Sequence, residues 1–246
     1  MGDIRVGIGG WSYEPWRGTF YPHGTRQKDE LTYAGAHLTA IEINATYYGS
    51  QKPQSFANWA AAVPDGFKFA VKASRFCTNR RVLAEAGESV QRFANQGIAE
   101  LGDRLGPILW QFAATKQFDA GDMAAFIALL PDKVGGLPLR HAFEVRHESF
   151  CDPAFAVLMN KANAAIVFAD HPEYPCIDEA TADFSYARLM KTVEDQPLGY
   201  KGAALDGWAD RARQWAKSGD AFVFFISGAK VRAPAAALAL IDRLGG

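Results

Sequence analysis

Short apolar runs, rich in β-branched and aromatic residues, recur along the chain with polar or turn-forming residues between them. Runs of this kind are typical of strands. The sequence therefore predicts eight strands, which are Ile4–Gly9, Ala40–Thr46, Phe67–Ala73, Pro107–Phe112, His141–Arg146, Ala165–Ala169, Phe184–Leu189 and Ala221–Ile226.

Segments whose apolar residues return with helical spacing lie between most of these strands. They are Glu30–Leu38, Pro53–Ala62, Glu85–Leu105, Ala120–Leu130, Pro153–Ala162, Asp206–Lys217 and Pro234–Leu244. An alternation of strand and helix predicts parallel strands joined by crossover helices. Eight such strands in 246 residues fit an α/β fold of the TIM (β/α)8-like barrel type.

The crossover from the sixth to the seventh strand departs from the pattern. Between Ala169 and Phe184 the chain carries Pro172, Pro175 and several polar residues, which argue against a packed helix. We therefore expect a loop there in place of the helix.

A doubly wound open sheet is the rival architecture. It would normally carry a Gly-rich phosphate-binding turn after the first strand, but Gly7-Ile8-Gly9-Gly10-Trp11 lacks the GxGxxG spacing. No linker, fixed-length repeat or low-complexity tract interrupts the chain, so residues 1–246 are expected to form a single barrel domain.

Composition narrows the class of protein. With 49% hydrophobic, 22% charged and 13% aromatic residues the chain is not disordered, and a formal net charge of −1 excludes a generally basic nucleic-acid coat. No apolar run reaches the ~18–20 residues that span a bilayer, and no signal-peptide pattern is visible. The three cysteines form no CxxC pair. We expect a soluble, cytoplasmic protein with no membrane association and no disulfide framework.

Polar residues occupy strand positions that should face the barrel interior. In the second strand Glu42 and Asn44 alternate with apolar residues, and in the fifth strand Glu144 and Arg146 do so. Because active sites of such barrels lie at the carboxyl ends of the strands, this parity predicts a polar pocket at that end. Inward or strand-end positions in the other strands carry Lys72, Gln111, Asp170, Tyr186 and Arg188.

Carboxylates and guanidinium groups suggest the chemistry of this pocket. Glu42, Glu144 and Asp170 are the candidate catalytic residues, because carboxylates act as general acids and bases. Arginine forks bind carboxylate or phosphate groups. The residues expected to bind substrate are Trp11, Tyr13, Asn44, Lys72, Gln111, Arg146, His147 and Arg188.

Lys72 has two interpretations. An ion pair with Glu42 or Glu144 is favoured, since buried charges are usually paired. The alternative is a Schiff-base amine that is desolvated next to Arg146. A purely structural salt-bridge network at the mouth is a further alternative.

Two other kinds of site are less favoured. His147 and His171 follow strand ends, but no HxH or HExxH spacing supports a metal site, so we expect neither a metal nor another cofactor. Arg75, Arg80 and Arg81 follow the third strand. With the aromatic residues of the mouth they could hold a phosphate backbone, although small clusters of this kind are common on ordinary solvated loops.

Six segments of the chain resemble signatures of the YecE-like family (domain of unknown function 72). The resemblance covers nearly the whole chain and implies a TIM-barrel-like fold. It implies no established activity, because the family is largely uncharacterised. The segments are Trp11–Pro22, Glu42–Tyr48 (Glu-x-Asn-x-Thr-aromatic-Tyr), Phe67–Lys72, Gly106–Phe112, Glu144–Phe150 (Glu-x-Arg-His-x-Ser-aromatic) and Thr181–Leu189.

Four positions at or near the mouth depart from the family pattern. Asn79, Met190, Ser227 and Ala235 stand where the family tends to carry other polar residues, two of them histidines. A mechanism that needs those histidines is put in doubt. One alternative is therefore a diverged, non-catalytic binding protein.

The residues best support a pocket that binds or transforms a small anionic or hydroxylated molecule. Carboxylate acid–base chemistry would make the protein a hydrolase, a lyase or an isomerase. The alternatives are a nucleic-acid-binding or nuclease-like barrel and the non-catalytic binding protein. Substrate, reaction type and oligomeric state do not follow from the sequence.

Overall fold

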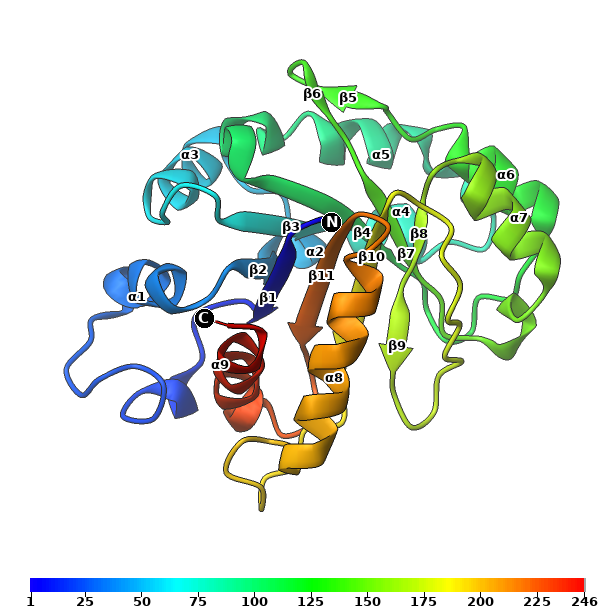
Figure 1. The fold of residues 1–246 in the computed structure, drawn as a ribbon. Helices are drawn as coiled ribbons and strands as arrows, with labels where there is room; N and C mark the ends of the chain where they lie inside the picture. The colour runs from blue at the N-terminus through cyan, green and yellow to red at the C-terminus, as the bar shows by residue number, and fades with distance from the viewer. Residues whose placement is uncertain (246) are drawn as a thin grey trace.

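The computed structural model describes residues 1–245, and its centre is a parallel sheet that curls into a barrel (Figure 1). In the sheet the order of strands is β8-β7-β4-β3-β2-β1-β11-β10-β9. The strands are β1 (Ile4–Gly9), β2 (Ala40–Ile43), β3 (Lys68–Lys72), β4 (Leu105–Gln111), β7 (His141–Glu144), β8 (Ala165–Ile166), β9 (Phe168–Asp170), β10 (Phe184–Leu189) and β11 (Asp220–Phe225).

The ring closes through a single stretch of chain. β8 pairs with β7 and β9 pairs with β10, so these two short strands are the two ends of the sheet order. Only Val167 separates them, and its amide donates to the carbonyl of Phe143 in β7. The predicted sixth strand, Ala165–Ala169, therefore joins both sides of an eight-membered ring, and the predicted TIM-like barrel is confirmed.

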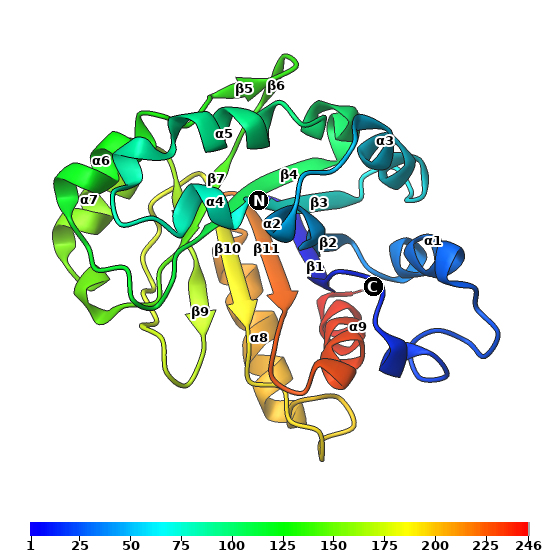
Figure 2. The same ribbon diagram turned by 180° about the vertical axis from the view of Figure 1, so that it is seen from behind.

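Helices cover the outside of the ring, and the view from behind shows the same arrangement (Figure 2). Side-chain caps begin three of them: Ser74, Asp119 and Asp152 accept hydrogen bonds from the amides of Phe76, Asp122 and Ala154. The helices are α1 (Glu30–His37), α2 (Ala45–Tyr48), α3 (Pro53–Ala61), α4 (Arg75–Thr78), α5 (Gly87–Ala94), α6 (Ala120–Ile127), α7 (Pro153–Lys161), α8 (Gly202–Trp215) and α9 (Ala233–Leu244).

Short 3-10 helices and one hairpin complete the fold. The hairpin pairs β5 (Lys133–Val134) with β6 (Leu137–Pro138) and was not predicted. None of the described helices is long and apolar enough to cross a membrane. The 3-10 helices are η1 (Glu14–Trp16), η2 (Gln27–Asp29), η3 (Leu83–Ala86), η4 (Ile98–Arg104), η5 (Glu148–Phe150) and η6 (Lys230–Arg232).

The predicted helix Glu85–Leu105 is wrong as a single element. The chain instead forms η3, α5 and η4: α5 ends at Ala94, and η4 begins directly after Gly97, whose backbone is left-handed with φ 118°. Five apolar residues still follow helical spacing across the break, which is why the sequence pattern suggested one helix. By contrast, the loop expected between the sixth and seventh strands is confirmed, because no helix lies between β9 and β10.

Side chains on the two faces of the ring form separate apolar layers. Outward residues such as Ile41, Phe69 and Phe143 pack against the helices, as their alternation predicted. The interior of the barrel holds a second cluster, to which β2, β3, β7 and β8 contribute alanines and β10 and β11 contribute aromatic side chains. Its members include Ala40, Ala70, Leu109, Ala142, Ala165, Tyr186, Phe222 and Phe224.

Candidate functional site

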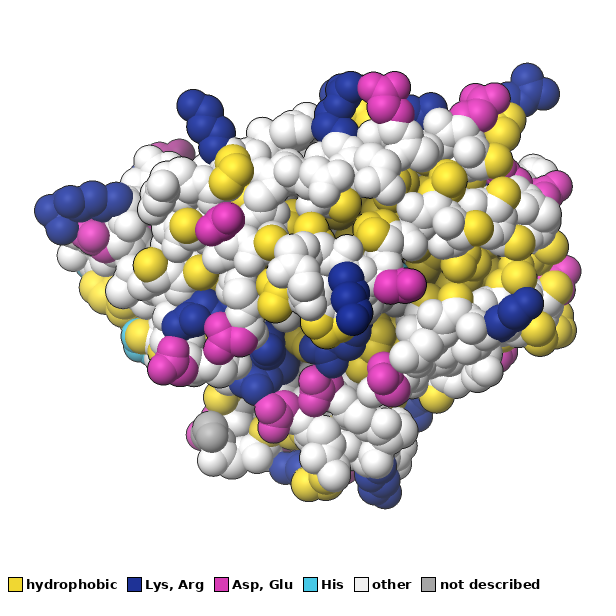
Figure 3. Space-filling view, turned by 90° about the horizontal axis from the view of Figure 1, so that it is seen from above, with side chains coloured by type: hydrophobic (Ala, Val, Ile, Leu, Met, Phe, Trp, Pro, Cys, Tyr) yellow, Lys and Arg dark blue, Asp and Glu magenta, His cyan; other side chains and the backbone are white. Residues whose placement is uncertain are grey.

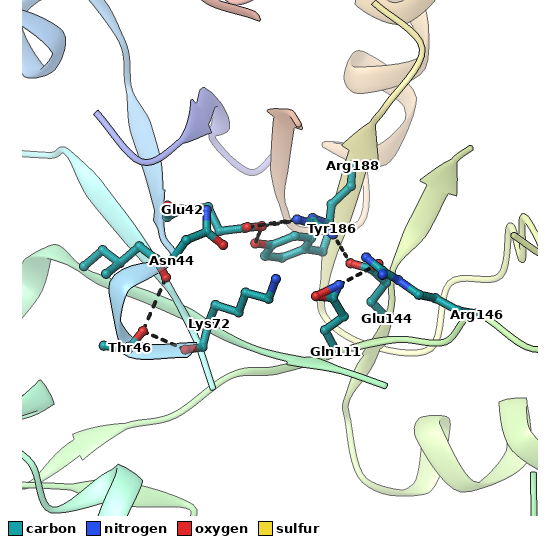
Figure 4. A network of polar contacts seen from close by, with 10 residues as sticks. Glu42, Asn44, Thr46, Lys72, Gln111, Glu144, Arg146, Tyr186 and Arg188 are labelled. Carbon is teal, nitrogen blue, oxygen red and sulfur yellow. Dashed lines mark hydrogen bonds and ion pairs between the residues drawn. The ribbon is translucent and has the colours of Figure 1, made fainter. Parts of the chain in front are cut away.

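A layer of polar side chains lies directly above the apolar interior of the barrel. In five strands the inward apolar residue is followed, two positions later, by a polar one that faces the same interior. These five side chains are all buried, and Figure 4 shows four of them joined by hydrogen bonds and ion pairs. They are Glu42, Lys72, Gln111, Glu144 and Arg188.

Arg188 at the end of β10 is the centre of this network. Its Nε and Nη2 atoms donate to the two carboxylate oxygens of Glu42, each over 3.1 Å, and its Nη1 donates to Glu144 Oε2. Burial opposes the charge of the guanidinium, but Glu144 and Glu42 outweigh that cost and raise the pKa of Arg188. The side chain is therefore a fixed positive charge held between two carboxylates.

Glu144 is held from three directions. Arg188 donates to its Oε2. Arg146 Nε donates to its Oε1 over 2.7 Å, and Gln111 Nε2 donates to the same oxygen over 3.3 Å. Burial opposes ionisation of this fully buried carboxyl, yet Arg188, Arg146 and Lys72 together lower its pKa. Glu144 is therefore ionised at neutral pH and fixes both arginines in place.

Glu42 is likewise fully buried and has its carboxylate surrounded by donors. Tyr186 donates its hydroxyl hydrogen to Glu42 Oε2 over 2.8 Å, beside the bonds from Arg188. Burial, followed by the charge of Glu42, raises the pKa of Tyr186 well above its usual value, so the phenol stays a donor. Sequence parity placed Tyr186 inside the barrel, but nothing in the sequence identified it as a partner of Glu42.

We expect Tyr186→Phe to lower the free energy of unfolding by about 2 kcal/mol, the worth of a buried hydrogen bond to a charged group. Urea unfolding monitored by circular dichroism measures this. Tyr48→Phe is the control, because the Tyr48 side chain is 69% exposed and should change stability by less than about 0.5 kcal/mol. Equal midpoints for the two variants would contradict the role given to the Tyr186 hydroxyl.

Lys72 at the end of β3 does not form the expected ion pair with Glu42 or Glu144. Within residues 1–245 no carboxylate oxygen lies within 4.0 Å of its amine, which instead sits 4.3 Å from the centre of the Tyr47 ring. The side chain extends towards the centre of the network (Figure 4). Burial, and then the neighbouring charge of Arg188, lowers the pKa of the Lys72 amine to about 8. Arg188 has taken both carboxylates, which leaves this amine free for a ligand.

The mouth of the barrel contains a cavity of about 510 Å³ that reaches Lys72 and Arg188. Four cationic side chains lie in its wall, and no aspartate or glutamate among the described residues does. Glu42 and Glu144 lie behind the wall with no exposed surface. The lining residues include Trp11, Asn44, Lys72, Arg146, Arg188 and Lys230.

The long first loop contributes Trp11 and supports Lys230. Buried Glu30 at the start of α1 accepts hydrogen bonds from Ser12 Oγ over 2.7 Å and from Arg17 Nε over 2.8 Å, which ties the loop to that helix. The indole of Trp16 donates to the carbonyl of Lys230, and the Lys230 amine lies 4.3 Å from the centre of the Tyr13 ring. Lys230 was missed because it begins η6, a 3-10 helix of three residues that is too short to give a periodic signal. Its only clue is a cation shortly after the eighth strand.

Six of the expected site residues do not line the cavity: Glu42, Gln111 and Glu144 are buried, and Asp170, His147 and Tyr13 have other partners. Asp170 Oδ1 forms an ion pair of 2.6 Å with Lys191, and the His147 ring hydrogen-bonds to Ser149 at the start of η5. Tyr13 packs edge-on against Trp16 with ring centres 5.2 Å apart. Among residues 1–245 no three His, Cys, Asp or Glu side chains are grouped so that they could hold a metal ion.

The positions that depart from the family pattern have different surroundings. Met190 is buried within the barrel interior, and Ala235 lies on α9. Asn79 Nδ2 is 3.5 Å from the hydroxyl of Tyr47, next to Lys72. Ser227 lines the cavity and has a positive φ of 62°, a conformation that costs a non-glycine residue free energy.

Comparisons with known proteins agree on one family. A family model described as "Protein of unknown function DUF72" matches residues 5–246. Similar curated proteins include UPF0759 protein YunF of Bacillus subtilis, 24% identical over 158 residues, and UPF0759 protein YecE of Escherichia coli, 26% identical over 147 residues. The alignments cover 62% and 60% of this chain but 54% and 50% of the relatives. The chain thus spans about half the length of these curated relatives.

Solved structures show the same fold. A DUF72 family protein from Thermotoga maritima superimposes with a TM-score of 0.80 at 22% identity and covers 99% of this chain and 100% of its own. One from Enterococcus faecalis gives a TM-score of 0.78 at 19% identity, covering 99% of this chain and 96% of its own. At such low identity these likenesses show the fold and nothing about a ligand.

Proposed function

The chain belongs to the DUF72 family of proteins of unknown function, and with this barrel as the premise we propose that its mouth binds a small anion, either a carboxylate or a phosphate ester. One observation carries the proposal: the cavity wall presents Lys72, Arg146, Arg188 and Lys230, while the carboxylates nearest to it are buried behind the wall. A ligand in the cavity meets positive charge.

The balance of charges supports an anionic ligand. Glu42 and Glu144 offset two of the three cations of the network, and Lys230 adds a further positive charge across the cavity. A buried positive charge without a counterion is costly, so an anion gains free energy by entering. Asn44 and Trp11 supply a hydrogen-bonding amide and an aromatic wall beside the cations.

In this proposal Glu42 and Glu144 position the arginines rather than transfer protons. Their carboxylates are fully buried, and each is held by hydrogen bonds from protein donors at both oxygens. Asp170, paired with Lys191, would act only on a ligand that extends beyond the cavity. Arg146, which is partly exposed and faces the cavity, makes the direct contact with the anion.

We expect inorganic phosphate and pyruvate to bind the protein, and Lys230→Met to weaken both by about tenfold, because one charge-assisted contact is worth about 1.5 kcal/mol. Isothermal titration calorimetry measures this. Lys230 is the test position because no carboxylate in the described chain pairs with it, so its removal leaves the buried network intact. The control is Lys217→Met, which removes an exposed cation beyond α8 and should leave affinity unchanged. No binding by the unaltered protein would refute the proposal.

A nucleic acid is the second candidate ligand, favoured by the exposed aromatic rings of Tyr48 and Phe76 near the mouth and by Arg75, whose guanidinium lies 5.3 Å from the Phe76 ring. Arg80, however, is engaged by the carbonyls of Phe76 and Glu85. Figure 3 shows the side of the molecule where β1 and β11 begin, away from the mouth, and there positive and negative side chains are mixed without a continuous basic surface. DNA affinity that falls steeply between low and moderate salt would favour this candidate instead.

A further inference from the structure

We propose that Lys72 forms a Schiff base with the carbonyl carbon of an anionic aldehyde or ketone bound in the barrel mouth. The inference rests on the proposed anion binding and adds to it a reaction and a substrate class. The observation behind it is an amine that is enclosed by the barrel, reaches the cavity and has no carboxylate partner in the described chain.

Lys72 differs from three other lysines of the barrel and its loops, and it shares with Lys230 a position over an aromatic ring. Lys68, at the start of the same strand, donates to the carbonyl of Asp103. Lys116 and Lys191 form ion pairs with Asp122 and Asp170. Each of those amines has an oxygen partner that favours its charged form. The Lys72 amine lies 4.3 Å from the centre of the Tyr47 ring, with the charges of Arg188, Glu42, Glu144 and Arg146 nearby, and no acceptor among residues 1–245 hydrogen-bonds to it.

These surroundings favour the neutral amine, which is the nucleophilic form. With a pKa of about 8, roughly a quarter of the Lys72 side chains are neutral at pH 7.5, compared with about one in a thousand for an ordinary lysine. Desolvation by the barrel and the nearby positive charge of Arg188 produce this shift, in that order. The lone pair is therefore available near neutral pH.

The step balances without any oxidant or reductant. The nitrogen lone pair attacks the carbonyl carbon and forms the C–N bond, while the electrons of the C=O π bond move to oxygen, which takes a proton. The nitrogen gives up one proton, and the resulting carbinolamine loses its hydroxyl group, on protonation, as water. The sum is amine plus carbonyl compound plus one proton giving an iminium ion plus water.

The cavity wall selects the substrate class. An iminium ion at Lys72 adds a positive charge next to Arg188, and this is unfavourable unless the substrate brings negative charge with it. Arg146 and Lys230, in the same wall, are placed to hold a carboxylate or a phosphate group of that substrate. A carbonyl compound that carries such a group therefore fits the site better than a neutral aldehyde or ketone.

Trapping with borohydride tests the inference, since hydride reduces an imine to a stable secondary amine. The protein is incubated with pyruvate or with dihydroxyacetone phosphate, reduced, and examined by intact mass and peptide mapping. We expect at least one of the two probes to modify one lysine per chain, Lys72, and acetone to give about tenfold less adduct because it lacks the anionic contact. The yield should rise with pH around pH 8.

Two variants separate the possible outcomes. Lys72→Arg should abolish the adduct, whereas Lys68→Arg, a matched change at the other end of β3, should retain it. If neither probe modifies Lys72 although calorimetry shows that phosphate and pyruvate bind, the Schiff base is refuted and the proposed anion site stands. If no anion binds, the proposed function falls and this inference with it. Equal trapping of acetone would overturn the anionic substrate class.

Discussion

Replacing Arg188 with methionine is expected to destabilise the protein by about 3–5 kcal/mol, because two buried carboxylates then lose the guanidinium between them. Glu42 and Glu144 have no exposed surface, so water cannot take over the hydrogen bonds that Arg188 donates. Methionine occupies a similar volume in the barrel, and the effect is therefore one of charge rather than of packing. Equilibrium unfolding in urea at pH 7 measures the loss.

The pH dependence of this loss distinguishes charge from packing. In the unaltered protein the pKa of Glu144 is lowered, so its contribution to stability is present above its unfolded pKa and is lost as the pH falls through the folded value. Without Arg188, burial dominates and raises the pKa of Glu144. The ionised carboxylate then destabilises the folded state, and this cost disappears as the pH falls and the carboxyl is protonated. The difference in the free energy of unfolding between the unaltered protein and Arg188→Met should therefore be largest at neutral pH and become smaller towards pH 4.

Two further variants complete the test. Adding Glu42→Gln and Glu144→Gln to Arg188→Met removes the unpaired charges and should recover most of the lost stability, since a buried ion pair is often replaceable by neutral groups. Arg188→Lys keeps one charge but cannot bind both carboxylates at once, and should fall between the two. If Arg188→Met unfolds at the same urea concentration as the unaltered protein, the network does not hold the barrel mouth together.

Strand periodicity was sufficient to predict which side chains share the barrel interior. Neighbouring residues of a strand face opposite sides, so the apolar run around Ile41 and Ile43 sets the direction of Glu42. The same reasoning placed Lys72 and Arg188 inside. It works because β2, β3 and β10 each bury an apolar outer face against helices, which leaves only one orientation for the strand.

The partners within that interior could not be predicted. Glu42 and Arg188 are 146 residues apart, and their contact depends on the register around the closed ring. For this reason the ion pair expected for Lys72 is absent, while Arg188 binds both carboxylates. The partners of residues at and after the strand ends were equally beyond the pattern. Asp170 is the last residue of β9 and His147 follows β7, but Lys191 and Ser149 engage their side chains.

Lys72→Met is expected to stabilise the protein at pH 7 by about 3 kcal/mol, because the folded state holds this amine at a pKa about two and a half units below its unfolded value and each unit is worth about 1.4 kcal/mol. Here the folded pKa is the lower one. As the pH falls, the Lys72 amine of the unfolded chain is protonated near pH 10.5, whereas that of the folded chain is protonated only near pH 8. Lys72 therefore lowers the free energy of unfolding by its maximal amount below pH 8 and has no such effect above pH 10.5.

Urea unfolding of both proteins between pH 6.5 and 11 follows this cost directly. The advantage of Lys72→Met should be constant below pH 8 and shrink as the pH rises to about 10.5, whereas Lys217→Met, at an exposed position, should show no difference at any pH. A destabilised Lys72→Met protein would show that the amine is satisfied by the barrel as it stands. A stabilised one indicates a residue that is retained at the expense of stability, as expected where an amine is kept ready for a ligand.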